Sequence, residues 1–116
     1  DDENKVITVK TPAGNVVVLS DKDQSITLTD QNGNKVELGS GGVTVDSPKD
    51  IKLSAKGSIS IDAVGALSLS SKADVKLAGL NVNATAQVGL VAKGSATAEL
   101  SASGQTTVKG AMVMIN

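Results

Sequence analysis

The chain of 116 residues carries a net charge of −1 and contains no Phe, Tyr, Trp, Cys or His. Aromatic side chains normally fill the core of a β-sandwich, so their absence indicates a thinner interior. The same composition excludes a disulfide framework, base stacking and chemistry at histidine or cysteine, so we expect no nucleic-acid partner and no enzyme activity.

Residues 1–42 carry short apolar pairs that lie nine or ten residues apart, with turn-forming stretches between them: Ile7/Val9, Val16/Val18, Ile26/Leu28 and Val36/Leu38. Each pair predicts a strand with one apolar side. The dipeptide Asn32-Gly33 favours a hairpin, although a longer corner in one helical coil would explain it equally well. We assign residues 1–42 as an N-terminal β segment with longer turns that leads into a regular repeat.

Residues 43–116 carry that repeat, which has a period of eight residues. Its clearest block consists of Ile51/Leu53, Ile59/Ile61, Leu67/Leu69 and Val75/Leu77, and Val43/Val45 continue it one octad upstream. Each octad has a three-residue strand core and a polar link, with Gly57 and Gly65 at two of the predicted corners. A short repeat of this kind predicts a β-solenoid or an intertwined β-helix.

Downstream of Leu77 the phase of the repeat slips. We place the following pairs, again eight residues apart, at Leu80/Val82, Val88/Leu90, Ala96/Ala98, Gly104/Thr106 and Met112/Met114. The smaller residues in this series predict an interior that narrows before the end. Val113 and Ile115 could equally form the inward pair of the last strand.

One octad cannot bury its own apolar pair, and a chain of 11.6 kDa has limited core in any case. Association of identical chains would supply the missing partner surface. No helical period is present anywhere, so the chain is predicted to be all-β.

We find no catalytic, cofactor-binding or metal-binding residues. Asp30-x-Asn32-x-Asn34 has the beginning of a calcium loop, but Lys35 stands at the position of its glycine and Gly41 at that of its bidentate glutamate.

Three further features of the chain carry little functional weight. Asn83-Ala-Thr85 matches the glycosylation sequon, a pattern that is frequent by chance. The longest apolar run, Val16 to Leu19, is far shorter than a membrane span of about 20 residues. The chain begins at Asp1 without Met, and we expect it to be a segment of a longer protein.

The octad array that ends in Lys109-Gly-Ala-Met-Val-Met-Ile-Asn116 resembles the C-terminal β-helix of spike proteins from contractile injection systems. These proteins include the VgrG proteins of type VI secretion and the central spikes of contractile phage tails. Thr11-Pro-Ala-Gly-Asn15, Ser25-Ile-Thr-Leu-Thr-Asp30 and Ile51-Lys-Leu-Ser-Ala-Lys-Gly57 are also similar to that family. The implied fold is an intertwined three-stranded β-helix that forms a homotrimeric needle.

In such a trimer the two-residue spacing would direct the apolar octad residues toward a threefold axis. The predicted trimer core consists of Ile51, Leu53, Ile59, Ile61, Leu67, Leu69, Val75 and Leu77.

The resemblance also implies a function. Such needles pierce a target envelope and carry a PAAR-repeat cap at the blunt end. The expected docking tip consists of Gly110, Ala111, Met112, Val113, Met114, Ile115 and Asn116. Further expected partners are the hub and OB-fold portion of the same spike, the tail tube and, transiently, the target membrane. Assembly is expected in the bacterial cytoplasm or the virion, followed by ejection into the target envelope. Some phage spikes hold a histidine-ligated iron at the point, which a chain without histidine cannot do.

A single-chain β-solenoid that acts as a binding or adhesive module is the alternative, because three octads also make one 24-residue coil. Such a solenoid would leave two sheet edges exposed without a capping element.

Overall fold

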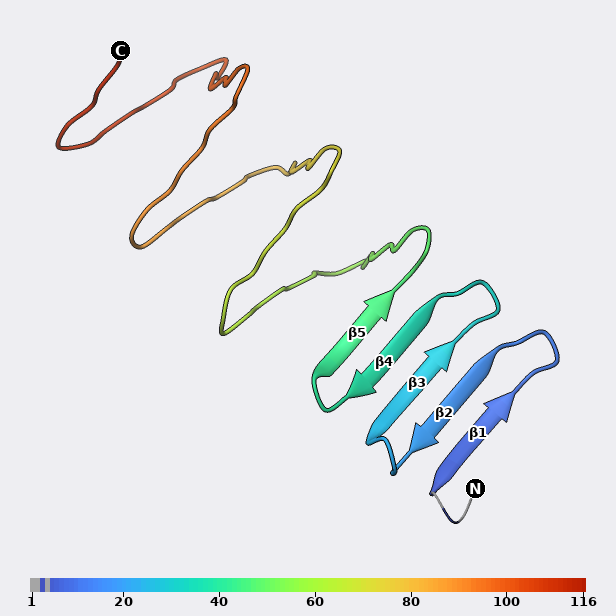
Figure 1. Ribbon diagram of the computed structural model, residues 1–116. Helices are drawn as coiled ribbons and strands as arrows, with labels where there is room; N and C mark the ends of the chain where they lie inside the picture. The colour runs from blue at the N-terminus through green and yellow to red at the C-terminus, as the bar shows by residue number, and fades with distance from the viewer. Residues whose placement is uncertain (1–2, 4) are drawn as a thin grey trace. The chain divides into compact units, whose positions relative to one another are not determined.

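The computed structural model describes residue 3 and residues 5–116 of the chain, and this part contains strands and extended segments without a helix. Five strands form one sheet: β1 (Val6–Lys10), β2 (Val16–Ser20), β3 (Ser25–Thr29), β4 (Lys35–Gly39) and β5 (Gly42–Asp46). Each strand pairs antiparallel with the next one along the chain (Figure 1). The prediction of an all-β chain is confirmed.

The turn from Asp30 to Asn34 closes a hairpin between β3 and β4, which decides between the two interpretations of Asn32-Gly33. The Asp30 carbonyl accepts the Gly33 N–H at 3.3 Å, and the Asp30 N–H donates to the Asn34 carbonyl at 3.0 Å. Gly33 has a φ of 91°, a conformation that residues with a side chain rarely adopt. Glycine at this position therefore permits the turn.

The register divides the sheet into an apolar and a polar face. Residues directly opposite each other on paired strands share a face. The apolar face consists of two rows that cross all five strands: Ile7, Leu19, Ile26, Leu38 and Val43 in the first row, and Val9, Val17, Leu28, Val36 and Val45 in the second. The boundary predicted from the sequence lies between residues 42 and 43. The pairing of β4 with β5 runs across this point, from Gly42 to Asp46.

The predicted pair in β2 is wrong by one residue. Val18 lies opposite Thr8 and Thr27, and Val16 lies opposite Lys10 and Thr29, so both belong to the polar face. All four residues from Val16 to Leu19 are apolar, and their pattern fits either parity. The turns on each side of β2 fix the register instead.

Within the described residues of the first unit, no segment covers the apolar face. Among the described residues no apolar side chain is buried, and Ile7 and Val43 remain 63% and 69% exposed. Ser20 is the one buried residue in this part of the chain, and its Oγ accepts a hydrogen bond from the Asp23 N–H at 3.0 Å. The sheet therefore has no core of its own on either side.

The chain divides into two compact units, Asp1–Ala66 and Leu67–Asn116. In the first unit, extended segments follow β5 and bend at Lys56-Gly57 and at Val64-Gly65. In the second unit the backbone repeats this alternation of extended segments and bends. Its bends lie at Lys72-Ala73, Leu80, Gln87-Val88, Ser95-Ala96, Ser103-Gly104 and Ala111-Met112. The period of eight predicted from the sequence is thus visible in the backbone.

The bends correct the predicted phase downstream of Leu77. Leu80 and Val88 lie at bends and are almost fully exposed, at 99% and 103%. The extended segments instead carry the pairs Val82/Ala84, Leu90/Ala92, Ala98/Leu100 and Thr106/Val108. The predicted strand cores downstream of Leu77 begin two residues too early. One repeat is shortened by a residue between Val75 and Val82, and this produces the slip.

Two residues after each of these apolar pairs, directly before the bend, the chain always holds a small residue: Ala55, Ala63, Ser71, Gly79, Ala86, Gly94, Ala102 and Gly110. At Gly94 an added Cβ would collide with the Thr97 carbonyl oxygen, and at Gly110 it would lie 3.1 Å from that of Met112. The backbone of the following bend therefore leaves no space for a side chain at Gly94 and only a tight fit at Gly110.

Candidate interaction surfaces

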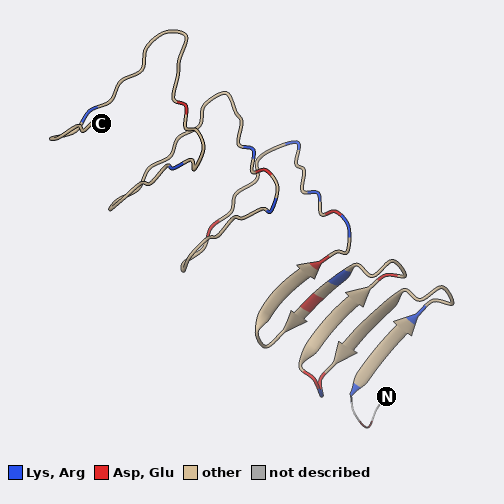
Figure 2. Ribbon diagram, turned by 45° about the horizontal axis from the view of Figure 1, so that its top comes forward, with Lys and Arg blue, Asp and Glu red and all other residues tan. Residues whose placement is uncertain are grey.

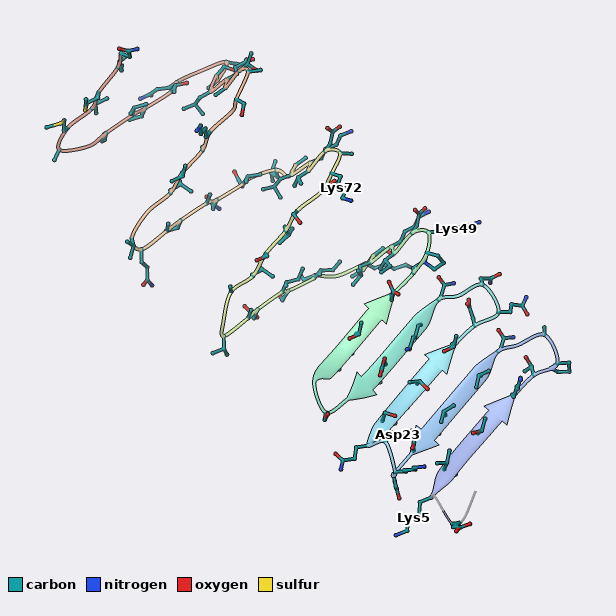
Figure 3. The ribbon with its side chains drawn as sticks, viewed as in Figure 1. Lys5, Asp23, Lys49 and Lys72 are labelled. Atoms are coloured by element: carbon teal, nitrogen blue, oxygen red, sulfur yellow. The ribbon has the colours of Figure 1, made fainter. Side chains whose placement is uncertain are left out.

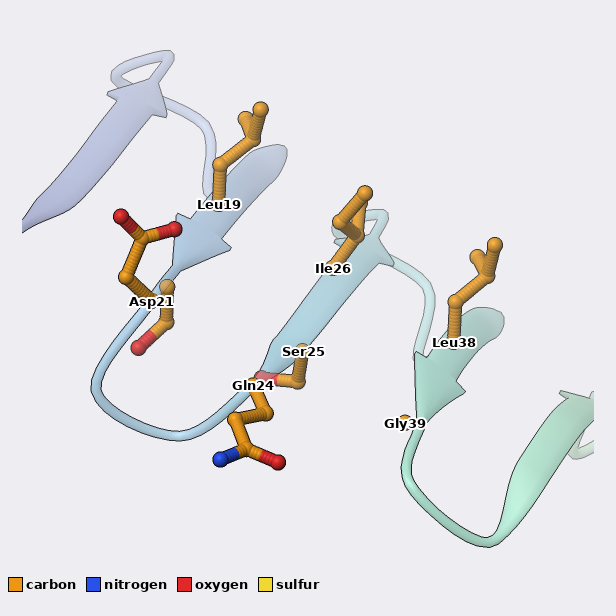
Figure 4. Close-up of a pocket in the computed structure, with 8 residues that line it drawn as sticks. Leu19, Asp21, Gln24, Ser25, Ile26, Leu38 and Gly39 are labelled. Atoms are coloured by element: carbon orange, nitrogen blue, oxygen red, sulfur yellow. The ribbon is translucent and has the colours of Figure 1, made fainter.

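The apolar face of the sheet is a continuous apolar surface of ten side chains in the first unit. Figure 4 shows Leu19, Ile26 and Leu38 projecting to the same side of three adjacent strands. They line a hollow whose remaining residues lie near the strand ends: Ser20, Asp21, Gln24, Ser25 and Gly39. A second hollow lies over Val9, Val17, Leu28 and Val36 in the other row. Side chains of this kind offer packing surface rather than chemistry.

The polar face carries threonines and charged side chains. Lys35 and Glu37 form an ion pair there at 3.1 Å, with both side chains nearly half exposed. Figure 2 shows the lysines and carboxylates of the described residues at intervals along the chain. Within the described residues no group of three or more His, Cys, Asp or Glu side chains could hold a metal ion.

The Asp30 carboxylate is engaged by its own turn. Its Oδ1 accepts the N–H groups of Asn32 and Asn34, each at 2.9 Å, and its Oδ2 accepts their side-chain amides at 3.4 and 2.8 Å. These donors, first of all the Asn34 side chain, hold the pKa of Asp30 below its ordinary value. The oxygens that a calcium loop would present to the ion are occupied by amide donors here.

The predicted trimer-core residues lie in extended segments between bends. The four from Ile51 to Ile61 belong to the first unit, and the four from Leu67 to Leu77 belong to the second. All are exposed, from 53% at Ile51 and Ile59 to 80% at Leu77. The chain by itself brings none of these pairs into a buried core.

The backbone of residues 51–116 is also without partners. No backbone–backbone hydrogen bond forms within this range, all of which the structure describes. Its internal hydrogen bonds are short-range ones that involve side chains, such as Ser101 Oγ to Glu99 Oε1 at 3.0 Å. Figure 3 shows the side chains of these segments spread along an open backbone. Extended backbone normally pairs its N–H and C=O groups with another strand. Residues 51–116 find no such partner strand within the described part of the chain.

The predicted tip, residues 110–116, bends at Ala111 and Met112 and then continues as an extended segment. Its apolar side chains are exposed: Met112 by 79%, Val113 by 49%, Met114 by 85% and Ile115 by 90%. It carries no charged side chain. A tip of this kind offers an adaptable apolar surface.

A family model for the phage baseplate V C-terminal trimerisation domain matches residues 6–88, which include the whole sheet and the first octads. The chain belongs to this family. No curated protein matches the chain. Family membership supports a homotrimer and a structural role in a phage tail or baseplate spike.

The sequence alone did not reveal the apolar face as one surface of ten side chains. It predicted the separate pairs, but only the strand register combines them into two rows. A run of alternating apolar residues in five successive strands was the available signal, and the four-residue apolar run in β2 obscured it.

Proposed function

We propose that three copies of this chain wind into an intertwined three-stranded β-helix, the needle of a spike in a contractile injection apparatus. The observation that carries this proposal is the extended backbone of residues 51–116, which has no partner within the chain while its apolar pairs repeat every eight residues. Three such chains would pair their strands with one another and enclose the inward residues.

In this trimer the sheets would pack with their apolar faces toward a common axis. Ten aliphatic side chains per chain would leave water, each stabilising by roughly 1.5–3 kcal/mol if fully buried. A large part of this gain offsets the ordering of the backbone. The free edge of β5 would pair with an octad strand from a neighbouring chain. Strands would thus pair within one chain up to β5 and between chains from there on.

The alternative of a single-chain solenoid is disfavoured. A solenoid requires hydrogen bonds between successive coils of one chain, yet residues 51–116, all of them described, form no backbone–backbone bond with each other. The trimerisation-domain family also favours association.

The needle would act mechanically and without catalysis. Its expected surroundings are the cytoplasm or virion in which it assembles and the target envelope into which it is ejected. A position in a type VI VgrG protein or in a phage tail spike agrees equally with these features.

The tip would dock a PAAR-repeat cap. Three copies of residues 110–116 around the axis would present an uncharged triangular surface, on which the methionines adapt to an uneven partner.

The oligomeric state tests the needle. Light scattering on the purified chain should give three times the chain mass of 11.6 kDa. A monomer would support the solenoid and reject the trimer.

Docking requires a separate experiment. Deletion of residues 112–116 should abolish binding of a cognate PAAR protein while the mass remains that of the trimer. Undiminished binding would eliminate the tip as the docking surface without affecting the needle.

A further inference from the structure

Asn32 is the one asparagine in the sequence that is followed by glycine. Glycine has no side chain to hinder the approach of its backbone nitrogen to the preceding residue. Asn32 is also exposed, so water reaches its side chain. These features make the Asn32-Gly33 bond the most reactive asparagine site of the chain.

We propose that Asn32 is a site of spontaneous deamidation and that the Asp30 side chain slows this reaction in the folded hairpin. The inference does not depend on the proposed function of the chain. It concerns the slow chemical modification of the β3–β4 turn.

The reaction requires only water. The Gly33 nitrogen loses its proton and bonds to Cγ of Asn32. The Asn32 amide nitrogen takes up a proton, the Cγ–Nδ2 bond breaks, and ammonia leaves, so that a five-membered succinimide remains. Water then opens either carbonyl of the ring, which produces aspartate or isoaspartate at position 32. No atom is oxidised or reduced.

The folded turn holds both reacting groups in other contacts. The Gly33 N–H donates to the Asp30 carbonyl at 3.3 Å. The Asn32 side-chain amide donates to Asp30 Oδ2 at 3.4 Å, while the Asn32 N–H donates to Oδ1 at 2.9 Å. Ring closure has to break the first bond and rotate the side chain out of the second. The Asp30 carboxylate therefore opposes the geometry that the reaction needs.

Deamidation would in turn weaken the turn. An acid at position 32 replaces the amide donor with a second carboxylate beside Asp30, and like charges repel. Asn34 shares the same Asp30 oxygens and accepts a hydrogen bond from Ser47 Oγ at 2.7 Å. Deamidation at Asn32 would thus also weaken the contact between this turn and Ser47, in the segment that follows β5.

The test compares the full chain with Asp30→Ala during incubation in mildly alkaline buffer. Peptide mass spectrometry measures deamidation at each asparagine, and isoaspartate is quantified separately. We expect Asn32 to react roughly tenfold or more faster in Asp30→Ala. The substitution removes the hydrogen bonds from Asn32 to the charged Asp30 side chain, which stabilise the unreacted turn. Asp23→Ala, a change in the β2–β3 turn, should leave the rate unchanged. Asn15, Asn81 and Asn83 serve as internal controls, because none of them is followed by glycine or bonded to Asp30.

Circular dichroism reports whether Asp30→Ala still folds, and the wild-type chain unfolded in urea gives a second measurement. Release of the turn in urea should accelerate the reaction at Asn32 as the substitution does. Equal rates in folded and unfolded wild-type chain would overturn the protective role of Asp30. An Asn32 that stays intact in all three samples would overturn the site itself.

Discussion

Asp30 and Thr11 occupy the first position of two turns with the same construction. In each turn a side-chain oxygen of this residue accepts the N–H of the fifth residue, at 2.9 Å from Asn34 and 3.1 Å from Asn15. Each turn also has a glycine of positive φ at its fourth position. These side chains substitute for the backbone bonds that a turn leaves unmade.

A third loop at the same end of the sheet begins in the same way but does not close. Ser47 follows β5, and its Oγ accepts the Lys49 N–H at 3.2 Å. Asp50 and Ile51 then stand where the closed turns have glycine and asparagine. Asp50 does not adopt a positive φ. The chain therefore continues into the octads instead of forming another hairpin strand.

The lowered pKa of Asp30 predicts a pH dependence of stability. The pKa of this carboxyl is lower in the folded turn than in the unfolded chain, so its ionised form stabilises the fold at pH values above the unfolded pKa. This contribution should disappear as the pH falls below about 4 and passes through the folded pKa. Thermal melts between neutral pH and strongly acidic pH measure the effect.

Asp30→Asn provides the control for this prediction. It should have a lower melting temperature than the wild type at neutral pH, and the difference between the two should shrink in acid. A constant difference across the whole range would contradict the role of the charge.

At the level of elements, the β-sheet is specified by alternation and the octads by repetition, and neither element is stable alone. An isolated antiparallel sheet with one exposed apolar face has no second layer to pack against. The exposed rows of β1–β5 therefore require a partner surface, which other copies of the chain can supply.

The two faces of β2 respond differently to charge if the register is right. Val17→Asp would place a carboxylate within the second apolar row, between Val9 and Leu28, whereas Val18→Asp would lie between Thr8 and Thr27. We expect Val17→Asp to abolish the trimer because of the cost of desolvating a charge, and Val18→Asp to preserve it. Light scattering distinguishes the two, and the reverse result would show that the opposite face packs inward.

The octads allow the same comparison between neighbouring residues. Ile59→Asp would bring three carboxylates together in an apolar layer, at a cost of several kcal/mol. Ser60→Asp should change the stability by no more than about 0.5 kcal/mol, since it faces away. A heat-resistant trimer of Ile59→Asp would show that the inward assignment is wrong.

Repetition allowed the sequence to predict much of this organisation, but not its register. Val75 and Leu77 lie in the extended segment predicted for them, because three regular octads precede them. The shortened repeat that follows leaves two possible phases two residues apart, and the sequence alone favoured the pair Leu80/Val82 over Val82/Ala84, the pair in the extended segment. All five strands of the sheet were predicted, the last of them as part of the octad repeat, whereas the face of Val16 to Leu19 depended on the length of the turns.

At the level of the whole molecule, folding and association should be one process. The described chain has neither a buried apolar residue nor backbone pairing after Asp46, so a folded single chain would have few interactions to hold it. A chain of this kind acquires its core only when other copies supply it, and stability then depends on protein concentration.

The melting temperature should therefore rise with concentration. Unfolding of one trimer releases three chains, so mass action favours the trimer as the sample becomes more concentrated. With the usual unfolding entropy per residue, a tenfold increase should raise the melting temperature on the order of 4 °C. Calorimetry over a hundredfold range of concentration would measure this slope, at a scan rate slow enough for reversible unfolding. A self-contained solenoid has no such slope, and a melting temperature that stays constant over this range would require a core within the single chain.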